Sequence, residues 1–415
     1  MSSEIPFNVR RRIIGVLFVV SSLAAAAQVA YFTLMPFIAA DLSGSDSAAG
    51  VPSTLGLVFR ALTTYPLGWL MGRVGRRLGL SLGLFVGMLG TAVSAWAIGV
   101  GHFWIFAFGA GVAGVARGAS DLSRYAAAEV SPPQQRAKII GWIVFAGTIG
   151  ALMGPILVAP AAELAGRLGL AYETGPFWAA TLVLFLAIVL TFVFVRPDPL
   201  EISRQMAMAE RQEQGDLPEI PARPVHQLMK SWNVRLGMTS MAIGQLVMTM
   251  IMVITPLHMS HTGHGIDSIS FVILAHQLGM FGLSSLTGWL VDRFGPATVI
   301  IGGSAVLVTA SMLSPLGTSV PFLTLSLFLL GLGWNLCFIA GSALLAVGLA
   351  PAESVRLQGM GDTWASAASA VGSLSSGFLF AMGTMSLVGA VGLGFSLSLI
   401  AAWVLSRQRM SIAQT

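Results

Sequence analysis

The chain has 415 residues, of which 55% are hydrophobic and only 9% are charged, and its mean hydropathy is +0.82. A soluble globular protein carries roughly 25% charged residues, so this composition excludes a soluble enzyme, a nucleic-acid-binding protein and a disordered scaffold. The single cysteine, Cys337, excludes a disulfide framework and a zinc-binding thiol pair, and the net charge of +5 comes mostly from basic residues at the ends of apolar stretches.

Apolar runs of about 20 residues, the length that crosses a bilayer as a helix, recur twelve times along the chain. They are 13–39, 49–71, 78–99, 102–128, 139–163, 174–195, 234–258, 267–291, 297–316, 320–347, 356–381 and 385–406. These runs are too long for barrel strands, and lipid admits only helices or closed barrels as spanning structures. The sequence therefore predicts an all-α membrane protein with twelve transmembrane helices.

The first predicted span follows a cluster of arginines, Arg10–Arg12. Such a start is typical of a cleavable signal peptide, but the apolar stretch continues to Ala40 and favours a retained helix. Lys and Arg gather on the cytoplasmic side of membrane proteins. With the N-terminus inside, only Arg167 of the 22 basic residues falls in an outward loop. We therefore predict that both termini are cytoplasmic.

The largest gap between predicted spans, residues 196–232, is rich in proline and mixed charges and separates six spans from six. We interpret this gap as a cytoplasmic linker. The predicted domains are an N-terminal six-helix half at 1–195, the linker at 196–232 and a C-terminal six-helix half at 233–415. An equal division of this kind is typical of transporters built from an internal repeat.

A short repeat supports this division. Gly68–Gly75 reads GWLMGRVG and Gly288–Gly295 reads GWLVDRFG, with five of eight residues identical at a spacing of 220 positions. Each copy closes the second span of its half. A weaker echo follows the fourth span of each half, at 131–136 and 350–356.

The repeated segments resemble the signature loop of the major facilitator superfamily, G-x-L-x-D-R-x-G-R-R. This resemblance implies a fold of two pseudo-symmetric six-helix halves, with a cytoplasmic latch whose charges pair in one conformation and separate in the other. The residues that match the latch are Arg73, Arg76, Arg77, Asp292 and Arg293. The first copy has Gly72 where the family usually has Asp, and whether the two copies act together stays open.

Ionisable residues also lie inside predicted spans, where each costs about 2.5–3.5 kcal/mol near the bilayer centre and implies a partner or a function. Arg117, Asp121 and Arg124 fall on one face of the fourth span. They form either a structural ion-pair cluster or a gating or proton-coupling centre that works through Asp121. Arg60 in the second span and Asp362 in the eleventh are similar candidates that stand alone.

Two pairs of metal-ligand residues lie on consecutive spans of the C-terminal half. Met248 and Met252 are four residues apart in the seventh span, and His276 and Met280 are four apart in the eighth. Each pair occupies one helical face, and the two pairs overlap in depth near the middle of the membrane, where transporters of this type bind substrates. Thioethers with one imidazole form a soft ligand set that selects Cu(I) over hard cations, although methionine on a helix usually only packs.

The two motifs, M-x-x-x-M on the seventh span and H-x-x-x-M on the eighth, resemble those of the CcoA-type bacterial copper importers of the same superfamily. The segment 255–259, TPLHM, and the run Gly333–Asn335 fit the same subfamily. This resemblance implies that the methionine and histidine side chains of the motifs bind copper, which then supplies cytochrome oxidase assembly. Related members move riboflavin or other organic solutes, so membership of the subfamily leaves the substrate open.

A histidine-rich outward loop follows the seventh span and contains His258, His261 and His264. We predict that this loop collects metal at low affinity and feeds it to the membrane site. The alternative is a polar interfacial loop in which the histidines are incidental.

We therefore predict a secondary active transporter of the bacterial inner membrane that imports copper by alternating access. It performs no covalent chemistry and holds no permanent cofactor, and its partners are the copper ion, the bilayer and downstream copper chaperones, with no nucleic acid. The rival prediction is a transporter of an organic solute such as riboflavin or a drug, in which Trp142, Tyr31 and Phe32 stack on a planar ligand. A static membrane scaffold is disfavoured, because it has no need of latch loops.

Overall fold

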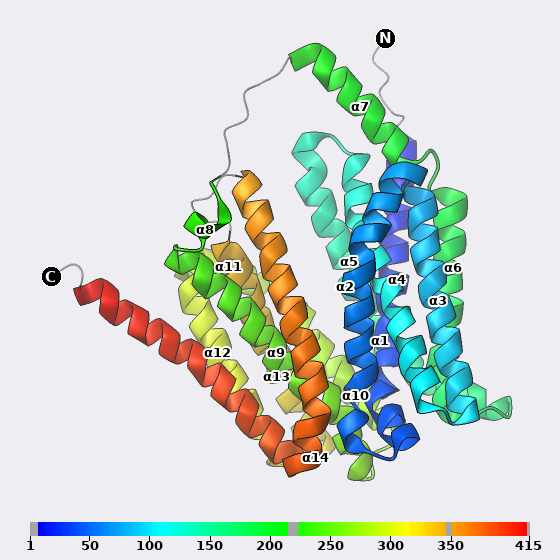
Figure 1. The fold of residues 1–415 in the computed structure, drawn as a ribbon, viewed down its shortest axis with the longest axis vertical. Helices are drawn as coiled ribbons and strands as arrows, with labels where there is room; N and C mark the ends of the chain where they lie inside the picture. The colour runs from blue at the N-terminus through cyan, green and yellow to red at the C-terminus, as the bar shows by residue number, and fades with distance from the viewer. Residues whose placement is uncertain (1–6, 215–222, 346–350, 413–415) are drawn as a thin grey trace. The chain divides into compact units, whose positions relative to one another are not determined.

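The computed structural model describes residues 7–214, 223–345 and 351–412, and every regular element among these residues is helical. The chain divides into two compact units (Figure 1). Unit 1 contains Met1–Ile38 and Leu55–Glu219, and unit 2 contains Ala39–Thr54 and Ile220–Thr415. Unit 2 therefore includes the short connection between the first two helices of the chain.

Unit 1 is built from long helices that follow one another along the chain. These helices are α1 (Phe7–Ser43, whose last residues belong to unit 2), α2 (Val51–Val74, whose first residues belong to unit 2), α3 (Arg76–Val100), α4 (Phe103–Glu129), α5 (Pro133–Arg167), α6 (Gly175–Phe194) and α7 (Pro199–Gln214), with the 3-10 turn η2 (Tyr172–Thr174) before α6. α3 packs closely on α4, because Gly90 of α3 meets the α4 backbone at Ala113 and leaves no room for a Cβ atom. Small residues at such contacts let membrane helices approach each other.

Unit 2 is organised around one central helix, α13. Its elements are η1 (Asp46–Ala48), α8 (Val225–Leu228), α9 (Trp232–His261), α10 (Ile266–Gln277), the π-helical turn η3 (Leu278–Gly282), α11 (Ser284–Phe294), α12 (Pro296–Leu313), α13 (Val320–Leu344) and α14 (Pro351–Ile412). α13 packs against α9, α10 and α12. α14 contains two residues with non-helical backbone angles, Gly383 and Thr384, which divide it into two helices.

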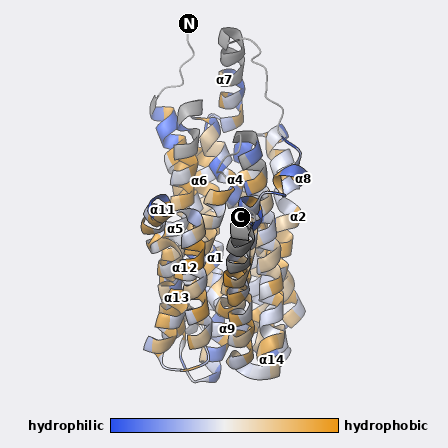
Figure 2. Cartoon of the chain, turned by 90° about the vertical axis from the view of Figure 1, so that its left-hand side faces the viewer, coloured by the Kyte–Doolittle hydropathy of each residue, from blue (hydrophilic) through white to orange (hydrophobic). Residues whose placement is uncertain are grey.

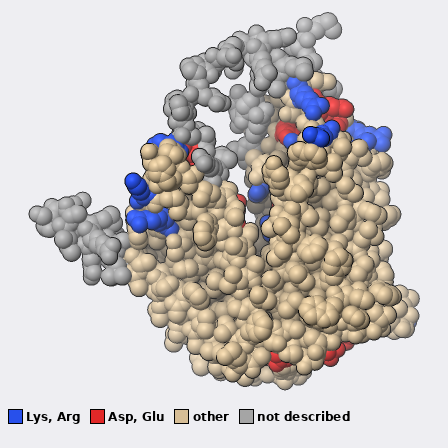
Figure 3. Space-filling view, viewed as in Figure 1, with Lys and Arg blue, Asp and Glu red and all other residues tan. Residues whose placement is uncertain are grey.

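The helices account for twelve membrane spans. Ten segments of the described residues are long and apolar enough to cross a bilayer. α2 is one more, although it contains Arg60 and Arg73, and the break at Gly383 and Thr384 divides the last segment into two. The prediction of an all-α membrane protein with twelve spans is therefore confirmed. Figure 2 shows hydrophobic residues along the helices of both units, and Figure 3 shows few charges on their sides.

The predicted central linker is partly helical. Its first part forms α7 and its last part contains α8, while residues 215–222 lie outside the described residues. The second copy of the weaker sequence echo begins at residue 350, which also lies outside them. The gap between the last two predicted spans coincides with the break in α14.

The connection between α1 and α2 is held by the first part of α14. Gly50 approaches α14 so closely that an added Cβ atom would overlap the carbonyl oxygen of Ser373. Beside this contact, the hydroxyls of Ser53 and Ser373 are 2.6 Å apart and share a hydrogen bond. These contacts explain why Ala39–Thr54 belongs to unit 2.

Candidate functional site

Three charged side chains of unit 1 meet within the spanning parts of α2 and α4. Arg60 Nη2 lies 2.7 Å from Asp121 Oδ2, and Arg117 Nε lies 3.2 Å from Asp121 Oδ1. The side chains of Arg60, Asp121 and Arg117 keep 34%, 24% and 31% of their surface exposed. One carboxylate therefore interacts with two guanidinium groups in an environment that is not fully closed to small molecules. We call these three residues the charged cluster.

Close packing of α2 on α4 positions the charged cluster. An added Cβ atom at Gly114 of α4 would overlap the carbonyl oxygen of Gly56 of α2. Arg60 follows Gly56 by one helical turn. On α4, Arg117 and Asp121 follow Gly114 by one and two turns. The guanidinium of α2 consequently reaches the carboxylate of α4, a pairing that the sequence analysis missed because it treated Arg60 as a lone charge.

Arg124, which the sequence places on the same face of α4, interacts with its neighbour in the chain. Its Nη2 donates a hydrogen bond to Tyr125 Oη at 3.2 Å, and its guanidinium carbon lies 5.0 Å from the centroid of the Tyr125 ring. Among the described residues, Arg124 Nε is buried without a hydrogen-bond partner. Arg117 and Asp121 are thus in contact, whereas Arg124 contacts Tyr125.

The arginines of the first latch copy are bound within unit 1. Arg76 donates two hydrogen bonds to the carboxylate of Glu129 on α4, from Nε to Oε2 at 2.8 Å and from Nη2 to Oε1 at 2.5 Å. Such bidentate pairing is the strong form of an arginine–carboxylate contact. The Arg73 guanidinium lies over the Trp69 ring, 4.0 Å from its centroid, which is cation–π geometry.

Asp198, which the sequence analysis did not identify, fixes the start of α3. Its Oδ1 accepts a hydrogen bond from the backbone N–H of Arg76 at 2.9 Å, and its Oδ2 accepts one from Arg77 at 3.0 Å. The preceding residue, Gly75, has a φ of 100° and passes so close to the carboxylate that a Cβ atom would overlap it. Asp198 thereby brings a carboxylate to the turn in which Gly72 replaces the usual aspartate of the family.

Replacing Asp198 with Ala is expected to lower the free energy of unfolding by about 1 kcal/mol, the effect of removing a helix-capping side chain. Two backbone donors at the start of α3 lose their acceptor. Thermal unfolding of the purified protein in detergent measures the change, and Glu201→Ala, an exposed carboxylate three residues further on, is the control. Equal unfolding temperatures for the two variants would contradict the capping role.

The second latch copy has the same backbone turn and repeats the arginine–tryptophan contact of the first copy. Asp292 and Arg293 are exposed at the C-terminal end of α11. The Arg293 guanidinium lies 5.4 Å from the Trp289 ring centroid. Gly295, with a φ of 81°, leads directly into α12, as Gly75 leads into α3. The repeat therefore preserves a glycine turn between two helices, and cooperation between the two copies stays a prediction.

His276 of α10 is fully buried in unit 2. Its Nδ1 lies 2.9 Å from the carbonyl oxygen of Leu327 on α13, and because a carbonyl only accepts, Nδ1 carries the proton. Nε2 then keeps its lone pair, and it is buried without a hydrogen-bond partner among the described residues. Metal-binding histidines are commonly oriented by such a bond from the other ring nitrogen.

The three methionines of the predicted copper site are nearly buried, on two separate helical segments. Met248 and Met252 of α9 are 6% and 7% exposed, and Met280 of η3 is 8% exposed. In the described part of the chain, α9 packs mainly on α13 and α14, whereas α10 packs mainly on α13. The helices that carry the two motifs therefore do not pack extensively against each other. The described part of the chain contains no group of three or more His, Cys, Asp or Glu side chains able to hold a metal. A shared copper site of the methionines and His276 therefore stays a prediction.

The π-helical turn η3 directly follows His276 and Gln277, and Asn335 of α13 stabilises it. Asn335 Nδ2 donates hydrogen bonds to the carbonyl oxygen of Met280 at 2.6 Å and to Ser284 Oγ at 2.8 Å. Its Oδ1 accepts a hydrogen bond from Thr287 at 2.5 Å. Single π turns inside helices are frequent at functional sites, and this turn lies at the predicted binding depth.

A polar and aromatic cluster in unit 2 was not identified from the sequence, although Trp334 falls in the subfamily run Gly333–Asn335. Trp334 Nε1 donates a hydrogen bond to Gln245 Oε1 at 2.7 Å. The Trp334 ring stacks on Phe338, with centroids 4.9 Å apart and an interplanar angle of 24°. Phe281 meets it edge-on at 6.0 Å. We call this group, with the two hydroxyl residues described next, the Gln245–Trp334 cluster.

The amide nitrogen of Gln245 is only loosely held. Its Nε2 is 3.2 Å from Thr249 Oγ1 and 3.4 Å from Ser369 Oγ, while the two hydroxyls are 2.9 Å apart and share a stronger hydrogen bond with each other. An amide NH₂ carries two donors, and hydrogen bonds of this length are weak. Gln245 therefore has donor capacity to offer a ligand. Gln245 and Trp334 are both partly exposed.

The aromatic side chains proposed for an organic-solute carrier do not form one site in unit 1, because Tyr31 is packed and Trp142 is half-exposed. Tyr31 is 5% exposed, and its ring lies 6.0 Å from that of Phe177. Trp142 is 51% exposed and tilts against Phe18 at 6.3 Å. Phe32 is partly buried. The Gln245–Trp334 cluster offers a more complete combination of ring faces and polar groups than these residues do.

Two of the three histidines of the predicted collecting loop share an aromatic partner. His258 and His261 lie against the Phe380 ring at 6.0 and 5.8 Å. His261 Nε2 is 3.5 Å from Asp46 Oδ1, and His264 Nδ1 is 3.0 Å from Thr262 Oγ1. Metal collection by this loop stays a prediction.

Arg223, at the end of the predicted linker, is tied to the start of α14. Its backbone N–H and Nε donate to Glu353 Oε1 at 2.9 and 2.8 Å, and its Nη2 donates to Oε2 at 2.8 Å. The hydrogen bonds from the guanidinium to this carboxylate, with its negative charge, raise the pKa of Arg223. The contact remains charged at neutral pH and links the chain before α9 to the helix that follows α13.

Known proteins with similar sequences and folds cover almost the whole chain. The family model of the Major Facilitator Superfamily matches residues 17–372. The uncharacterized MFS-type transporter YddS of Bacillus subtilis is 32% identical over 376 residues, which are 89% of this chain and 84% of YddS. The riboflavin transporter RfnT of Brucella anthropi is 28% identical over 356 residues, 85% of each chain. The crystal structure of a D-xylose–proton symporter, 16% identical, superposes with a TM-score of 0.68 over 94% of this chain and 96% of that one. The chain therefore belongs to the major facilitator superfamily and is a multi-pass membrane protein of the secondary-transporter type.

Proposed function

We propose that this protein transports a flat, polar organic solute, with riboflavin as the representative substrate. The observation that supports this proposal most is the Gln245–Trp334 cluster, which combines a partly exposed indole ring with an under-used amide donor. The similarity to the riboflavin transporter RfnT over 85% of both chains supports the same substrate class. This proposal favours the organic-solute alternative of the sequence analysis over copper import.

The chemistry of the cluster suits a ring system with a polar edge. Aromatic pairs in offset or edge-on arrangements contribute roughly 0.5–1.5 kcal/mol beyond the burial of their area. Trp334 is held by Phe338 on one side and by its hydrogen bond to Gln245, so little conformational entropy is lost when a ligand stacks on it. Gln245 Nε2 can exchange its long contacts for a shorter bond to a carbonyl oxygen of the ligand.

The charged cluster of unit 1 is proposed to couple transport to a proton. In its charged form, Asp121 compensates part of the positive charge of Arg60 and Arg117. Protonation of Asp121 removes that compensation and weakens both contacts, so the packing of α2 and α4 becomes dependent on proton binding. Ionisable residues within spans are expensive to insert and mark ion pathways in many transporters.

The remaining features of the proposal follow from the family and the charge pattern. The protein lies in the bacterial inner membrane with both termini in the cytoplasm, because Lys and Arg concentrate on that side in the predicted topology. It moves its substrate by alternating access, without covalent chemistry and without a permanent cofactor. The glycine turns at Gly75 and Gly295 carry the latch residues of the two units.

Copper is the second candidate substrate, and one observation favours it. His276 Nε2 is a buried lone pair without a hydrogen-bond partner in the described part of the chain, and Met280 lies one turn further along the same face. A soft monovalent cation would use these donors. Copper import would then require Met248 and Met252 as well, and it would leave the Gln245–Trp334 cluster without a role.

Binding of riboflavin to the purified protein tests the proposal, because the fluorescence of riboflavin is quenched when its ring stacks on tryptophan. Trp334→Ala is expected to raise the dissociation constant about tenfold, the equivalent of about 1.4 kcal/mol. Gln245→Ala is expected to weaken binding severalfold through the lost donor. Trp142→Ala, which removes an exposed indole outside the cluster, is the control. Equal affinities for wild type and Trp334→Ala would contradict the proposed site.

A further inference from the structure

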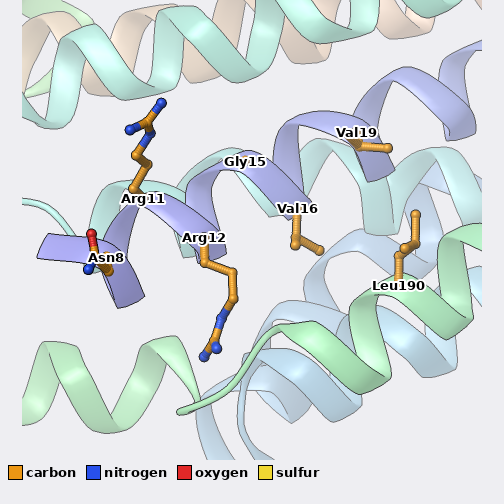
Figure 4. Close-up of a pocket in the computed structure, with 7 residues that line it drawn as sticks. All are labelled: Asn8, Arg11, Arg12, Gly15, Val16, Val19 and Leu190. Carbon is orange, nitrogen blue, oxygen red and sulfur yellow. The ribbon is translucent and has the colours of Figure 1, made fainter. Parts of the chain in front are cut away.

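A groove in unit 1 combines basic and apolar side chains at one membrane boundary. It has a volume of about 460 Å³ and runs between the start of α1 and the last turns of α6 (Figure 4). Its lining consists of Asn8, Arg11, Arg12, Gly15, Val16, Val19 and Leu190. None of these residues belongs to the charged cluster or to the Gln245–Trp334 cluster.

The lining changes from polar to apolar along the axis of α1. Asn8, Arg11 and Arg12 lie in the first two turns of the helix, and Figure 4 shows Arg11 and Arg12 projecting on opposite sides of the ribbon. Val19 lies about 10 Å deeper than Arg12, at a rise of 1.5 Å per residue. Basic groups therefore stand at headgroup level, and aliphatic side chains stand at the level where acyl chains begin.

A hydrogen bond joins the start of α1 to the end of α6 at the polar end of the groove. Arg12 Nη2 donates a hydrogen bond to the carbonyl oxygen of Arg196, which follows the end of α6. This bond ties the start of α1 to the end of α6 through the backbone of Arg196, whose guanidinium lies 6.0 Å from the centroid of the Phe192 ring. An arginine guanidinium carries five N–H donors, so Arg12 keeps donors for a bound oxyanion.

The groove opens among side chains that face lipid. Val19 is 45% exposed, and on α6 the neighbours of Leu190, Val189 and Val193, are 38% and 48% exposed. Gly15 leaves the middle of the groove open, because an added Cβ atom there would meet no atom within 4 Å. A soluble phosphate compound would gain nothing from the apolar half of such a groove, whereas a lipid fills both halves.

We propose that this groove binds one anionic phospholipid, such as phosphatidylglycerol, from the leaflet that contains the start of α1. The phosphate lies at the polar end of the groove, where Arg12 and Arg11 supply the positive charge, and the first part of an acyl chain packs on Val16, Val19 and Leu190. Juxtamembrane arginines attract anionic lipids by about 1 kcal/mol each, which corresponds to a preference over a zwitterionic lipid of roughly tenfold or more for two arginines. The bound lipid bridges α1 and α6 at the same place as the Arg12–Arg196 hydrogen bond.

Native mass spectrometry of the purified full chain, titrated with phosphatidylglycerol or phosphatidylcholine, tests this proposal. Wild type is expected to bind phosphatidylglycerol about tenfold more tightly, and the variant Arg11→Gln/Arg12→Gln is expected to lose that preference. Arg11→Gln alone keeps the Arg12–Arg196 bond and is expected to lose part of the preference for phosphatidylglycerol. Arg167→Gln is the matched control and is expected to keep the full preference. Arg167 is the last residue of α5, and its side chain is 78% exposed.

Two further arms separate a lipid site from a phosphate site. Gly15→Leu fills the open middle of the groove and is expected to reduce binding of both lipids severalfold, with an unchanged elution volume in size-exclusion chromatography. Glycerol 3-phosphate is expected not to compete. Equal binding of the two lipids by wild type, an unchanged preference in the double variant, or competition by glycerol 3-phosphate would overturn the proposal.

Discussion

Replacing Asp121 with Asn is expected to abolish proton-dependent uptake and to lower the free energy of unfolding by about 1–3 kcal/mol. Removing one partner of a fully buried ion pair costs about 3–5 kcal/mol, and the partial exposure of this cluster, 24–34%, reduces that cost through solvent screening. Asn has the shape of Asp without its charge, so Arg60 and Arg117 lose the carboxylate that both of them contact. Uptake driven by an imposed pH gradient and thermal unfolding in detergent measure the two effects.

A matched control separates the charged cluster from ordinary helix ion pairs. Glu163 and Arg167 of α5 are also four residues apart, with Nη2 and Oε2 at 3.5 Å, but both side chains are more than half exposed. Exposed pairs of this kind contribute about 0.3–0.5 kcal/mol, so Glu163→Gln is expected to change neither uptake nor the unfolding temperature appreciably. If Asp121→Asn behaved like Glu163→Gln, neither a coupling nor a structural role for Asp121 could be maintained.

A second variant separates coupling from structure. Asp121→Glu keeps the negative charge and can still reach both guanidinium groups. If Asp121 carries the coupled proton, this variant retains part of the pH-driven uptake, whereas Asp121→Asn retains only exchange that needs no gradient. Loss of stability without any change in the pH dependence of uptake would instead assign the cluster a purely structural role.

Replacing Gly114 with Val is expected to separate α2 from α4 and to destabilise the protein by several kcal/mol. The new side chain would overlap the backbone of Gly56, and a backbone atom cannot yield as a flexible side chain can. Overpacking a tight contact costs about 1–3 kcal/mol or more, and the displacement also pulls Arg60 away from Asp121. The Gly114→Val protein is expected to show reduced expression, a lower unfolding temperature and loss of uptake.

Gly99→Ala is the control for this prediction. Gly99 lies near the end of α3, and an added Cβ atom there would meet nothing within 4 Å. Alanine in a helix is favoured over glycine by about 0.5–1 kcal/mol, so this variant is expected to be neutral or slightly stabilising. A Gly114→Val protein with wild-type stability would show that the α2–α4 contact does not hold the charged cluster.

The number and type of the spanning segments could be predicted from the sequence because burial in lipid leaves a strong local signal. Each span is visible in the sequence as an apolar run, and the break at Gly383 and Thr384 falls in a gap between two predicted spans. The π turn at Leu278–Gly282 could not be predicted, because one extra residue in a helical turn hardly changes the apolar pattern. The side-chain bonds of Asn335 that stabilise the turn come from another helix.

Residues of the site were predicted where their chemistry is unusual for their position, and missed where only the fold brings them together. Asp121 stands out because a carboxylate in a span is rare, but its bond to Arg60 depends on the packing of α2 and α4. Asp198 lies in an ordinary polar loop and acquires its capping role only through the approach of that loop to Gly75. Gln245 is a single amide in an apolar helix, and its partner Trp334 lies 89 residues away.

Transport into proteoliposomes tests the substrate most directly, with radiolabelled riboflavin and radiolabelled copper measured side by side on the same purified protein. Organic-solute transport predicts saturable uptake of riboflavin that Trp334→Ala impairs and His276→Ala leaves intact, together with copper uptake no higher than in empty liposomes. The proposal of organic-solute transport would be contradicted if the protein took up copper but no riboflavin, and if His276→Ala and Met252→Ala abolished that copper uptake.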